Sequence, residues 1–261
     1  MSGRWGRWAA AFYLLLAYVF VILPVAALVL FSFQQSTLPV PPFDGPSLRW
    51  YRDVLGNAKL MAGLRHSALV GLASSLVAVL LGFLAAYGFA RHRVPGAPLL
   101  RWLLILPLTI SYLVIGMGLL LTFNALGIGK SLWAVGIGHV VINLPLCFAI
   151  LAGQMGEEQA TLERAARDLG AAEWQVLALI TAPVLLPALF AAFFLSFTLS
   201  WDEFVIAFLL SRFETTLPVE IWSLLRSGLN PRTNAIGSLV FLVSVVLVLV
   251  AETVLFRRRR A

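Results

Sequence analysis

Hydrophobic residues occur along the chain in six long runs, and no Lys, Arg, Asp or Glu interrupts any of them. The runs cover residues 8–43, 66–90, 102–129, 131–156, 174–201 and 233–251. Each is about as long as, or longer than, the roughly 20 residues that an α-helix needs to cross about 30 Å of hydrocarbon. The pattern predicts an all-α membrane protein in which residues 1–261 form one transmembrane domain. The six expected spans cover residues 9–33, 67–90, 100–123, 132–153, 184–210 and 234–256.

The composition agrees with this class of protein. Of the 261 residues, 61% are apolar and 12% are charged, and the mean hydropathy is +0.93. A soluble core cannot use so much apolar surface. Arg4 and Arg7 precede the first run, as in a secretory signal peptide. That run is too long for a signal peptide, however, and no clear small-residue cleavage site follows it, so we expect a retained first span.

The net charge of +7 raises the question of nucleic-acid binding, and the distribution of the charges argues against it. Six spans place both termini on one side of the membrane, and that side carries eleven of the 19 Lys and Arg residues, close to the helix ends. Cytoplasmic loops are enriched in such residues. We therefore expect both termini in the cytoplasm, and a basic charge that reflects topology and not a nucleic-acid partner.

The segment between the first two spans, residues 34–65, is expected outside the cytoplasm. It begins with the proline-rich stretch STLPVPPFDGPS, and Leu48, Tyr51 and Leu55 then recur at helical spacing with charges between them. This pattern is typical of an amphipathic helix at the membrane surface.

One charged stretch interrupts the apolar pattern on the cytoplasmic side, in the connecting loop 154–180 between the fourth and fifth spans. From Glu157 it reads as a helix, and Gly170 stands where a helix C-terminus favours a residue that adopts positive φ. Small and apolar residues recur on one face at helical spacing. Two interpretations are open: a helix that docks into the cleft of a partner, or a solvated connecting helix. The residues of that face are Leu162, Ala165, Ala166 and Leu169.

Ala165-Ala166, Gly170, Ile180 and Pro183 together resemble the EAA loop of permease subunits of binding-protein-dependent ABC importers. The resemblance implies the type I importer permease fold, with six spans and a coupling helix that sits in a groove of an ATPase subunit. The family glutamate falls on Arg164, with Glu163 one residue earlier, and the family leucine falls on Ala182. The coupling residues that the resemblance implies are Glu163, Arg164, Ala165, Ala166, Asp168 and Gly170.

The stretches FTLSWDEFVIAFLL and TTLPVEIWSLLRSGLNPRTNAIGSL resemble the polyamine-type (spermidine/putrescine) subfamily. This resemblance implies a multi-pass protein of the bacterial inner membrane that imports polyamines or a related small cationic solute. The implied partners are two ATPase subunits, a second permease that is usually a different chain, and a periplasmic or lipid-anchored substrate-binding protein. ATP hydrolysis is expected on the ATPase subunits, and this chain is expected to hold no catalytic residue, metal or cofactor.

Asp202 and Glu203 are acidic residues about 18 residues into the expected fifth span, in its outer part. Charges at such a depth usually face water, a partner or a substrate path, so both are path candidates, together with Trp201 and Tyr112. The alternative is that the span ends near Trp201 and leaves both carboxylates among the headgroups. Ser111-Tyr112 stands where the polyamine-type subfamily carries Pro-Glu. This chain therefore lacks one acid of the expected path, but the Tyr112 ring can still stack on a cation.

An ion-coupled secondary carrier is the main alternative function. Such a carrier needs ion-binding carboxylates near the membrane midplane, and the two candidates, Asp202 and Glu203, lie too far out. A membrane enzyme would need a cluster of catalytic side chains, whereas His66, His92 and His139 are widely separated and lack metal-ligand spacing. A passive channel would not require the charged loop.

Overall fold

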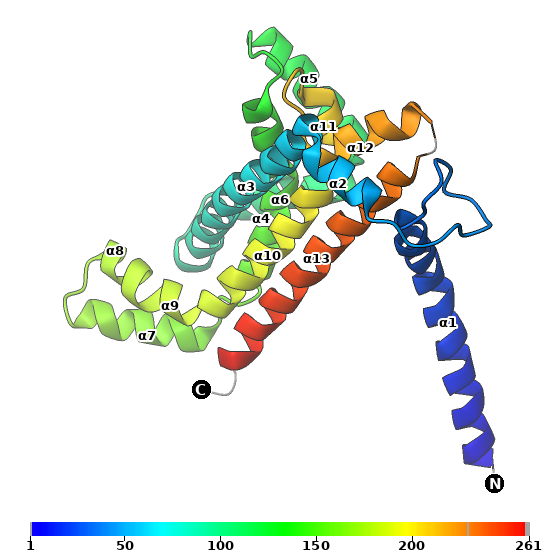
Figure 1. Ribbon diagram of the computed structural model, residues 1–261. Coiled ribbons are helices and arrows are strands. Elements are labelled where there is room, and N and C mark those ends of the chain that lie inside the picture. Colours follow the sequence, from blue (N-terminus) through cyan, green and yellow to red (C-terminus); the bar gives the residue numbers. More distant parts are fainter. Residues whose placement is uncertain (1, 229, 259–261) are drawn as a thin grey trace. The chain divides into compact units, whose positions relative to one another are not determined.

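The computed structural model describes residues 2–228 and 230–258, and the regular elements in these ranges are helices (Figure 1). An isolated antiparallel β-bridge joins Gln34 to Pro46. A 3₁₀ turn covers Leu106–Thr109 and a π-helical turn covers Val176–Thr181. The α-helices are α1 Ser2–Ser32, α2 Arg49–Gly56, α3 Ala58–Arg91, α4 Ala97–Ile105, α5 Tyr112–Ala125, α6 Leu132–Ala152, α7 Glu157–Asp168, α8 Glu173–Gln175, α9 Ala182–Val184, α10 Leu186–Asp202, α11 Val205–Leu210, α12 Leu217–Arg226 and α13 Pro231–Arg258.

Four straight helical segments among the described residues are long and apolar enough to cross a membrane: Gly6–Ser32, Ala58–Arg91, Leu132–Ala152 and Pro231–Val250. Two further spans arise if each of two bent helix pairs crosses once. These pairs are Ala97–Thr109 with Tyr112–Ala125, bent by 111°, and Glu173–Val184 with Leu186–Asp202, bent by 74°. The four to six spans correspond to the six apolar runs of the sequence.

The third span is not the single helix expected over residues 100–123. Pro107 lies in the 3₁₀ turn, Ile110 is extended, and the Ser111 hydroxyl accepts a hydrogen bond from the Leu113 amide at 3.3 Å as α5 begins. Proline removes a backbone donor and serine is a favoured helix N-cap, so the two residues stop one helix and start the next. The expectation of a continuous helix was wrong because the hydrophobic pattern does not register such a break.

The fifth span also differs from the range 184–210 expected for it. Helix α10 ends at Asp202, Glu203 is extended, and α11 begins at Val205. At the other end, the chain turns sharply around Leu185, ahead of α10. Residues 173–184 therefore leave the axis of α10 and continue the connecting segment that contains α7.

The described chain divides into two compact units, of which one comprises the residues up to Met61 together with Glu220–Val243. The expected surface helix is present in it as α2. Trp50 and Val54 are its buried residues, while Leu48 and Leu55 stay exposed on the protein surface. Trp50 Nε1 donates to the Gln34 carbonyl at 2.8 Å, and the Asp53 carboxylate pairs with Arg232.

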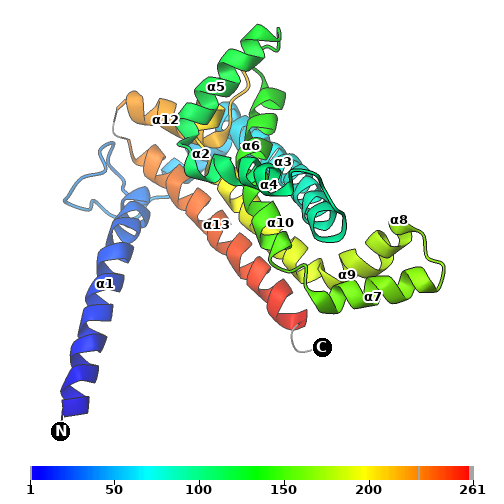
Figure 2. The ribbon, with the colours of Figure 1, turned by 180° about the vertical axis from the view of Figure 1, so that it is seen from behind.

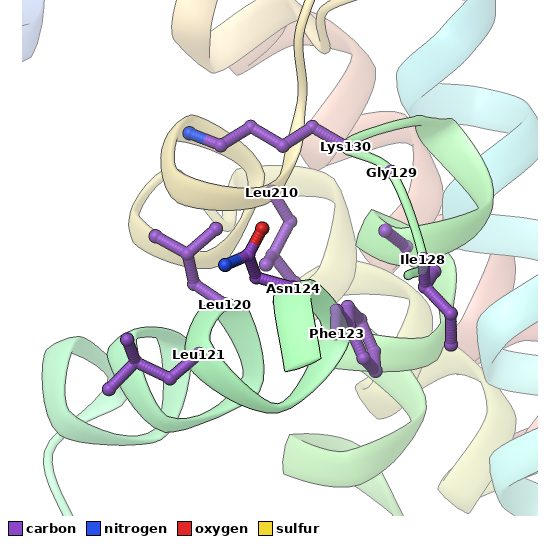
Figure 3. A pocket seen from close by; sticks show the side chains of 9 residues that line it. Leu120, Leu121, Phe123, Asn124, Ile128, Gly129, Lys130 and Leu210 are labelled. Atoms are coloured by element: carbon purple, nitrogen blue, oxygen red, sulfur yellow. The ribbon is translucent and has the colours of Figure 1, made fainter. Parts of the chain in front are cut away.

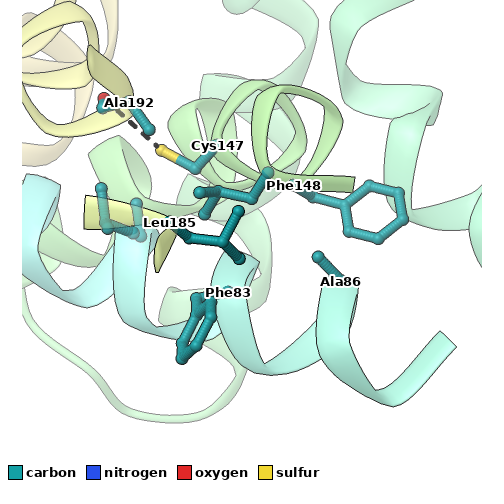
Figure 4. Packing of buried hydrophobic residues seen from close by; sticks show 9 residues of the cluster. Phe83, Ala86, Cys147, Phe148, Leu185 and Ala192 are labelled. Carbon is teal, nitrogen blue, oxygen red and sulfur yellow. Dashed lines mark hydrogen bonds between the residues drawn. The ribbon is translucent and has the colours of Figure 1, made fainter. Parts of the chain in front are cut away.

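The second unit comprises Ala62–Val219 and the residues from Ser244 onward, and its core lies between α3, α6 and the α9–α10 region. Figure 4 shows Phe83 and Ala86 of α3 against Cys147 and Phe148 of α6, with Cys147 Sγ 3.9 Å from the Ala192 carbonyl of α10. Because these helices carry small residues where they meet, their backbones approach closely. A Cβ on Gly82 would lie 2.9 Å from the Phe148 amide nitrogen.

This close approach predicts that Gly82→Ala destabilises the fold, because the methyl group would meet backbone atoms of α6. The expected loss is about 1–3 kcal/mol, as for other overpacked sites. Gly88→Ala is the matched control on the same helix, since no described atom outside its own helix backbone and neighbours lies within 4 Å of the added Cβ. The check is the thermal unfolding midpoint of the detergent-solubilised protein. Equal midpoints for the two variants would contradict the packing described here.

Candidate functional site

Helix α7 is a separate amphipathic helix, and its two ends are defined by local chemistry. At its start, Gln159 Oε1 accepts a hydrogen bond from the Gly156 amide at 3.2 Å. Glu157 and Glu158 lie in the first turn, where their negative charges interact favourably with the helix dipole. At its end, Gly170 adopts φ +87°, as expected, and the Ala171 amide donates to the Ala166 carbonyl at 3.1 Å. In both views of the ribbon, α7 lies beside the α8–α9 segment at one end of α10 (Figures 1 and 2).

The outward face of α7 and of the turn that follows carries apolar side chains in solvent. Leu162 is 53% exposed, Leu169 is 90% exposed and Trp174 is 67% exposed, while Ala165 between them is also exposed. Apolar side chains gathered at one surface commonly mark an interaction site. We call Leu162, Ala165 and Leu169 the α7 outer face; Trp174 is exposed on α8.

Glu163 lies on the opposite side of α7 and is fully buried. Its carboxylate accepts from Arg91 Nε at 2.6 Å and from Thr181 Oγ1 at 2.9 Å, and Arg91 also donates to the Gly156 carbonyl at 3.2 Å. Sequence reasoning grouped Glu163 with the docking residues. The structure instead places it inside the chain's own packing, so Glu163 does not belong to the exposed face.

A second polar cluster lies one helical turn further along α7. Arg167 donates to Glu173 at 2.8 and 3.1 Å and to the Tyr87 hydroxyl at 2.9 Å, and that hydroxyl donates to Glu173 at 3.0 Å. Hydrogen bonds from Arg167, and then from Tyr87, hold the pKa of the Glu173 carboxyl below its usual range. The bond to Glu173 likewise raises the pKa of the Arg167 guanidinium. Both side chains therefore stay charged near neutral pH.

Of the other coupling candidates, Arg164, Asp168 and Gly170 are exposed, and Ala166 is half-buried. Arg164 bonds within its own helix, to the Ala160 carbonyl and the Thr161 hydroxyl, each at 3.2 Å. A positive group thus stands in solvent at the position where the resembled loop has a glutamate.

The four path candidates separate into two buried and two accessible residues. Trp201 and Glu203 are buried, whereas Asp202 and Tyr112 are exposed. The Glu203 carboxylate accepts from the Ile206 amide at 2.9 and 3.1 Å and from the Ala207 amide at 3.1 Å, which caps α11. Glu203 is therefore a structural residue in this chain, and Asp202 and Tyr112 remain as accessible path candidates.

A buried polar chain supports Glu203 from the neighbouring helices. His139 Nε2 lies 3.4 Å from its carboxylate, and His139 Nδ1 lies 2.5 Å from the Ser200 hydroxyl. Ser200 in turn lies 3.1 Å from Ser74 Oγ on α3. Polar side chains between membrane helices commonly join them in this way.

A cavity of about 340 Å³ lies between the end of α5, the start of α6 and the end of α11 (Figure 3). Leu120, Phe123 and Leu210 contribute apolar walls, and Asn124 and Lys130 contribute polar groups. No path candidate lines this cavity.

Sequence reasoning missed Arg91, Thr181, Tyr87 and Glu173, which hold α7 in place. They lie up to 86 positions from their partners in the sequence, so no local motif connects them. One signal was present: Tyr87 and Arg91 on α3, and Glu163 and Arg167 on α7, are each spaced by one helical turn.

A family model described as "Binding-protein-dependent transport system inner membrane component" matches residues 78–260. The chain belongs to this family. It is 28% identical to the spermidine/putrescine transport system permease protein PotC of Escherichia coli (strain K12) over 250 residues, 95% of this chain and 94% of PotC. It is 31% identical to the putrescine transport system permease protein PotI of the same strain over 235 residues, 87% of this chain and 83% of PotI.

Among solved structures, the chain is similar to a bacterial ABC transporter involved in the import of the acidic polysaccharide alginate. The TM-score is 0.70 at 18% sequence identity, over 98% of this chain and 97% of the other. The expected fold class, an all-α importer permease, is thereby confirmed. The chain is a multi-pass transmembrane permease of a bacterial ABC importer, a subunit that is not itself catalytic and that works with ATPase subunits and a substrate-binding protein.

The different surroundings of Asp202 and Glu203 predict different effects on stability. Glu203→Gln weakens the cap of α11, and we expect a loss of about 1.5–3 kcal/mol, as for hydrogen bonds to charged groups. Asp202→Asn is the neighbouring control and should leave stability unchanged, because the side chain is exposed. The measurement is the thermal midpoint of each purified variant, and a larger loss for Asp202→Asn would refute the assignment.

Proposed function

We propose that this permease forms half of a substrate path and that α7 is the segment through which the ATPase subunits drive it. The α7 outer face carries this proposal, because an exposed apolar surface on a short cytoplasmic helix needs a partner to cover it. Helix-in-groove docking uses anchors at such helical spacing. Arg164, Ala165, Asp168 and Gly170 are the contact residues that we assign to the ATPase interface, with Ala166 at its edge.

The assembly that we propose contains this chain, a second permease of different sequence, two ATPase subunits, and a periplasmic or lipid-anchored binding protein. Both termini are placed in the cytoplasm, on the same side as α7, in agreement with the distribution of Lys and Arg. In this assembly the six spans form one transmembrane domain.

The cycle follows from this assembly. ATP binding brings the ATPase subunits together, α7 moves with them, and the spans change from an inward-facing to an outward-facing arrangement. Docking alone does not drive this change, because coupling requires contacts whose free energy differs between the two states. An ion-coupled carrier would need its own ion site, and the buried acid Glu203 is already engaged in capping α11.

For the substrate we propose a polyamine or a related small cationic solute. PotC and PotI carry spermidine and putrescine in their names. In this chain Asp202 offers an accessible carboxylate and Tyr112 an accessible ring, which are the two groups that attract an ammonium ion. Both are proposed to line the outer part of the path.

Ala165→Trp tests the docking role of α7. The indole would occupy the α7 outer face without disturbing the packing of α7, because Ala165 is exposed. We expect co-purification of the ATPase subunits, and ATP-driven uptake into proteoliposomes, to fall by about tenfold or more, which corresponds to about 1.4 kcal/mol of binding free energy. Ala165→Ser keeps the face small and should behave as wild type. Full assembly and uptake by Ala165→Trp would overturn the proposal.

Asp202→Asn tests the substrate class. We expect KM for putrescine or spermidine uptake to rise up to about fivefold, because an exposed charge pair is worth up to about 1 kcal/mol. Glu214→Gln, also an exposed acid, should leave KM unchanged. Uptake of 2-aminoethylphosphonate is measured in parallel, since a putative permease for it in Salmonella typhimurium is 29% identical to 80% of this chain. Uptake of that compound but of no polyamine would reject the substrate proposal.

A further inference from the structure

Two polar bridges join the cytoplasmic end of α3 to α7, and they have the same spacing on both helices. Arg91 of α3 meets Glu163 of α7 at 2.6 Å, and Tyr87 of α3 meets Arg167 of α7 at 2.9 Å. On each helix the two residues are four positions apart, so they lie on one face, one turn from each other. The two helices are therefore held at two points and not at one.

Each bridge has a third member from the chain that follows α7. Thr181 donates to Glu163 at 2.9 Å, and Glu173 accepts from both Arg167 and Tyr87. Residues 173–181 lead directly into α9 and α10, so the bridges also fix the segment that enters the fifth span. We call Tyr87, Arg91, Glu163, Arg167, Glu173 and Thr181 the α3–α7 joint.

The bridge between Arg91 and Glu163 is the more buried of the two. Glu163 is fully buried, and the Arg91 side chain is 11% exposed. A charge in such a place depends on its partner, because removing either partner leaves the other charge uncompensated and is strongly destabilising. Thr181 lies at the end of the π-helical turn and also donates to the Val176 carbonyl at 3.3 Å, and turns of this kind are frequent at functional sites.

The two sides of α7 thus differ in chemistry. The α7 outer face is apolar and exposed. On the inner side, Glu163 and Arg167 carry charges and form hydrogen bonds with residues of α3. A displacement applied at the outer face reaches the spans through the contacts of the inner side. A physical route of coupling needs an element that moves as a unit, and the joint supplies the contacts that would make α7 and the end of α3 such a unit.

We propose that the α3–α7 joint makes α7 and the cytoplasmic end of α3 one rigid body, so that the second span moves with α7 during transport. Glu163 and Arg91 are then positioning residues of coupling and not residues of the ATPase interface. This inference rests on the proposed function of α7 as the docking helix, and it adds that the second span moves with α7 as well as the fifth.

The first test measures the distance between α7 and α3 in the complete importer, in nanodiscs. Spin labels are attached to Glu157→Cys on α7 and Ala90→Cys on α3, both exposed positions, and the native Cys147 is buried. Electron–electron resonance then compares the resting complex with the complex trapped by a non-hydrolysable ATP analogue. We expect the same distance distribution in both states. A shift between the states in the wild-type sequence would overturn the proposal.

The second test breaks the joint without altering the outer face. Glu163→Gln keeps the shape of the side chain and removes its charge, and Glu157→Gln is the control, an exposed glutamate of the same helix. We expect Glu163→Gln to keep its ATPase subunits, to broaden the distance distribution, and to lower substrate uptake per ATP hydrolysed by about fivefold or more, as for a lost coupling free energy. The double variant Arg91→Glu/Glu163→Arg restores an ion pair between the two positions, and it should recover part of the substrate uptake per ATP hydrolysed.

The outcomes separate this inference from the proposed function. If substrate-loaded binding protein does not stimulate ATP hydrolysis by the wild-type complex, or no ATPase co-purifies, the proposed function fails and the inference fails with it. If stimulation is normal and Glu163→Gln keeps the uptake ratio of Glu157→Gln, the inference alone fails. If Glu163→Gln does not assemble, the wild-type distance measurement decides.

Discussion

The bilayer requires that backbone and side-chain polar groups find partners inside the protein, and this requirement governs where the chain can bend. At two of the breaks, a side chain accepts hydrogen bonds from amides at the start of the helix that follows. Ser111 accepts from the Leu113 amide where α5 begins, and Glu203 accepts from the first amides of α11. The buried carboxylate of Glu203 is consequently part of the fold, even though its depth in the fifth span first associates it with transport.

The buried polar groups of α7 need partners in the same way. Glu163 of α7 is buried, Arg91 pairs with its charge, and Thr181 donates a second hydrogen bond to its carboxylate. This arrangement turns one face of α7 inward and leaves Leu169 and Ala165 outward. The docking to an ATPase subunit that we propose needs such an exposed apolar face on a helix that is bonded to the rest of the chain on its other side.

The approximate positions of the candidate spans could be predicted from the sequence, because charge-free runs coincide with the apolar helices and bent helix pairs of the structure. The C-terminal end of α7 was also predictable, because a glycine directly after a helical pattern is typical of a helix end, and Gly170 adopts positive φ there. The break at Ile110 was not, because a single capping residue does not change the hydrophobic pattern. The end of a helix near Trp201 was one of the two alternatives that the sequence left open, and α10 ends at Asp202. The inward orientation of Glu163 was missed because Arg91 lies 72 positions away, and only the folded chain brings the two together.

Site-specific photo-crosslinking from α7 in the assembled importer tests the central claim most directly. A benzophenone amino acid replaces Leu169, which is 90% exposed, and, in a control, Phe213, which is 85% exposed and lies in the loop expected outside the cytoplasm. The account predicts that the probe at position 169 crosslinks to the ATPase subunit and that the probe at position 213 does not. Crosslinking from position 213 alone, or from neither position in a complex that transports, would contradict it.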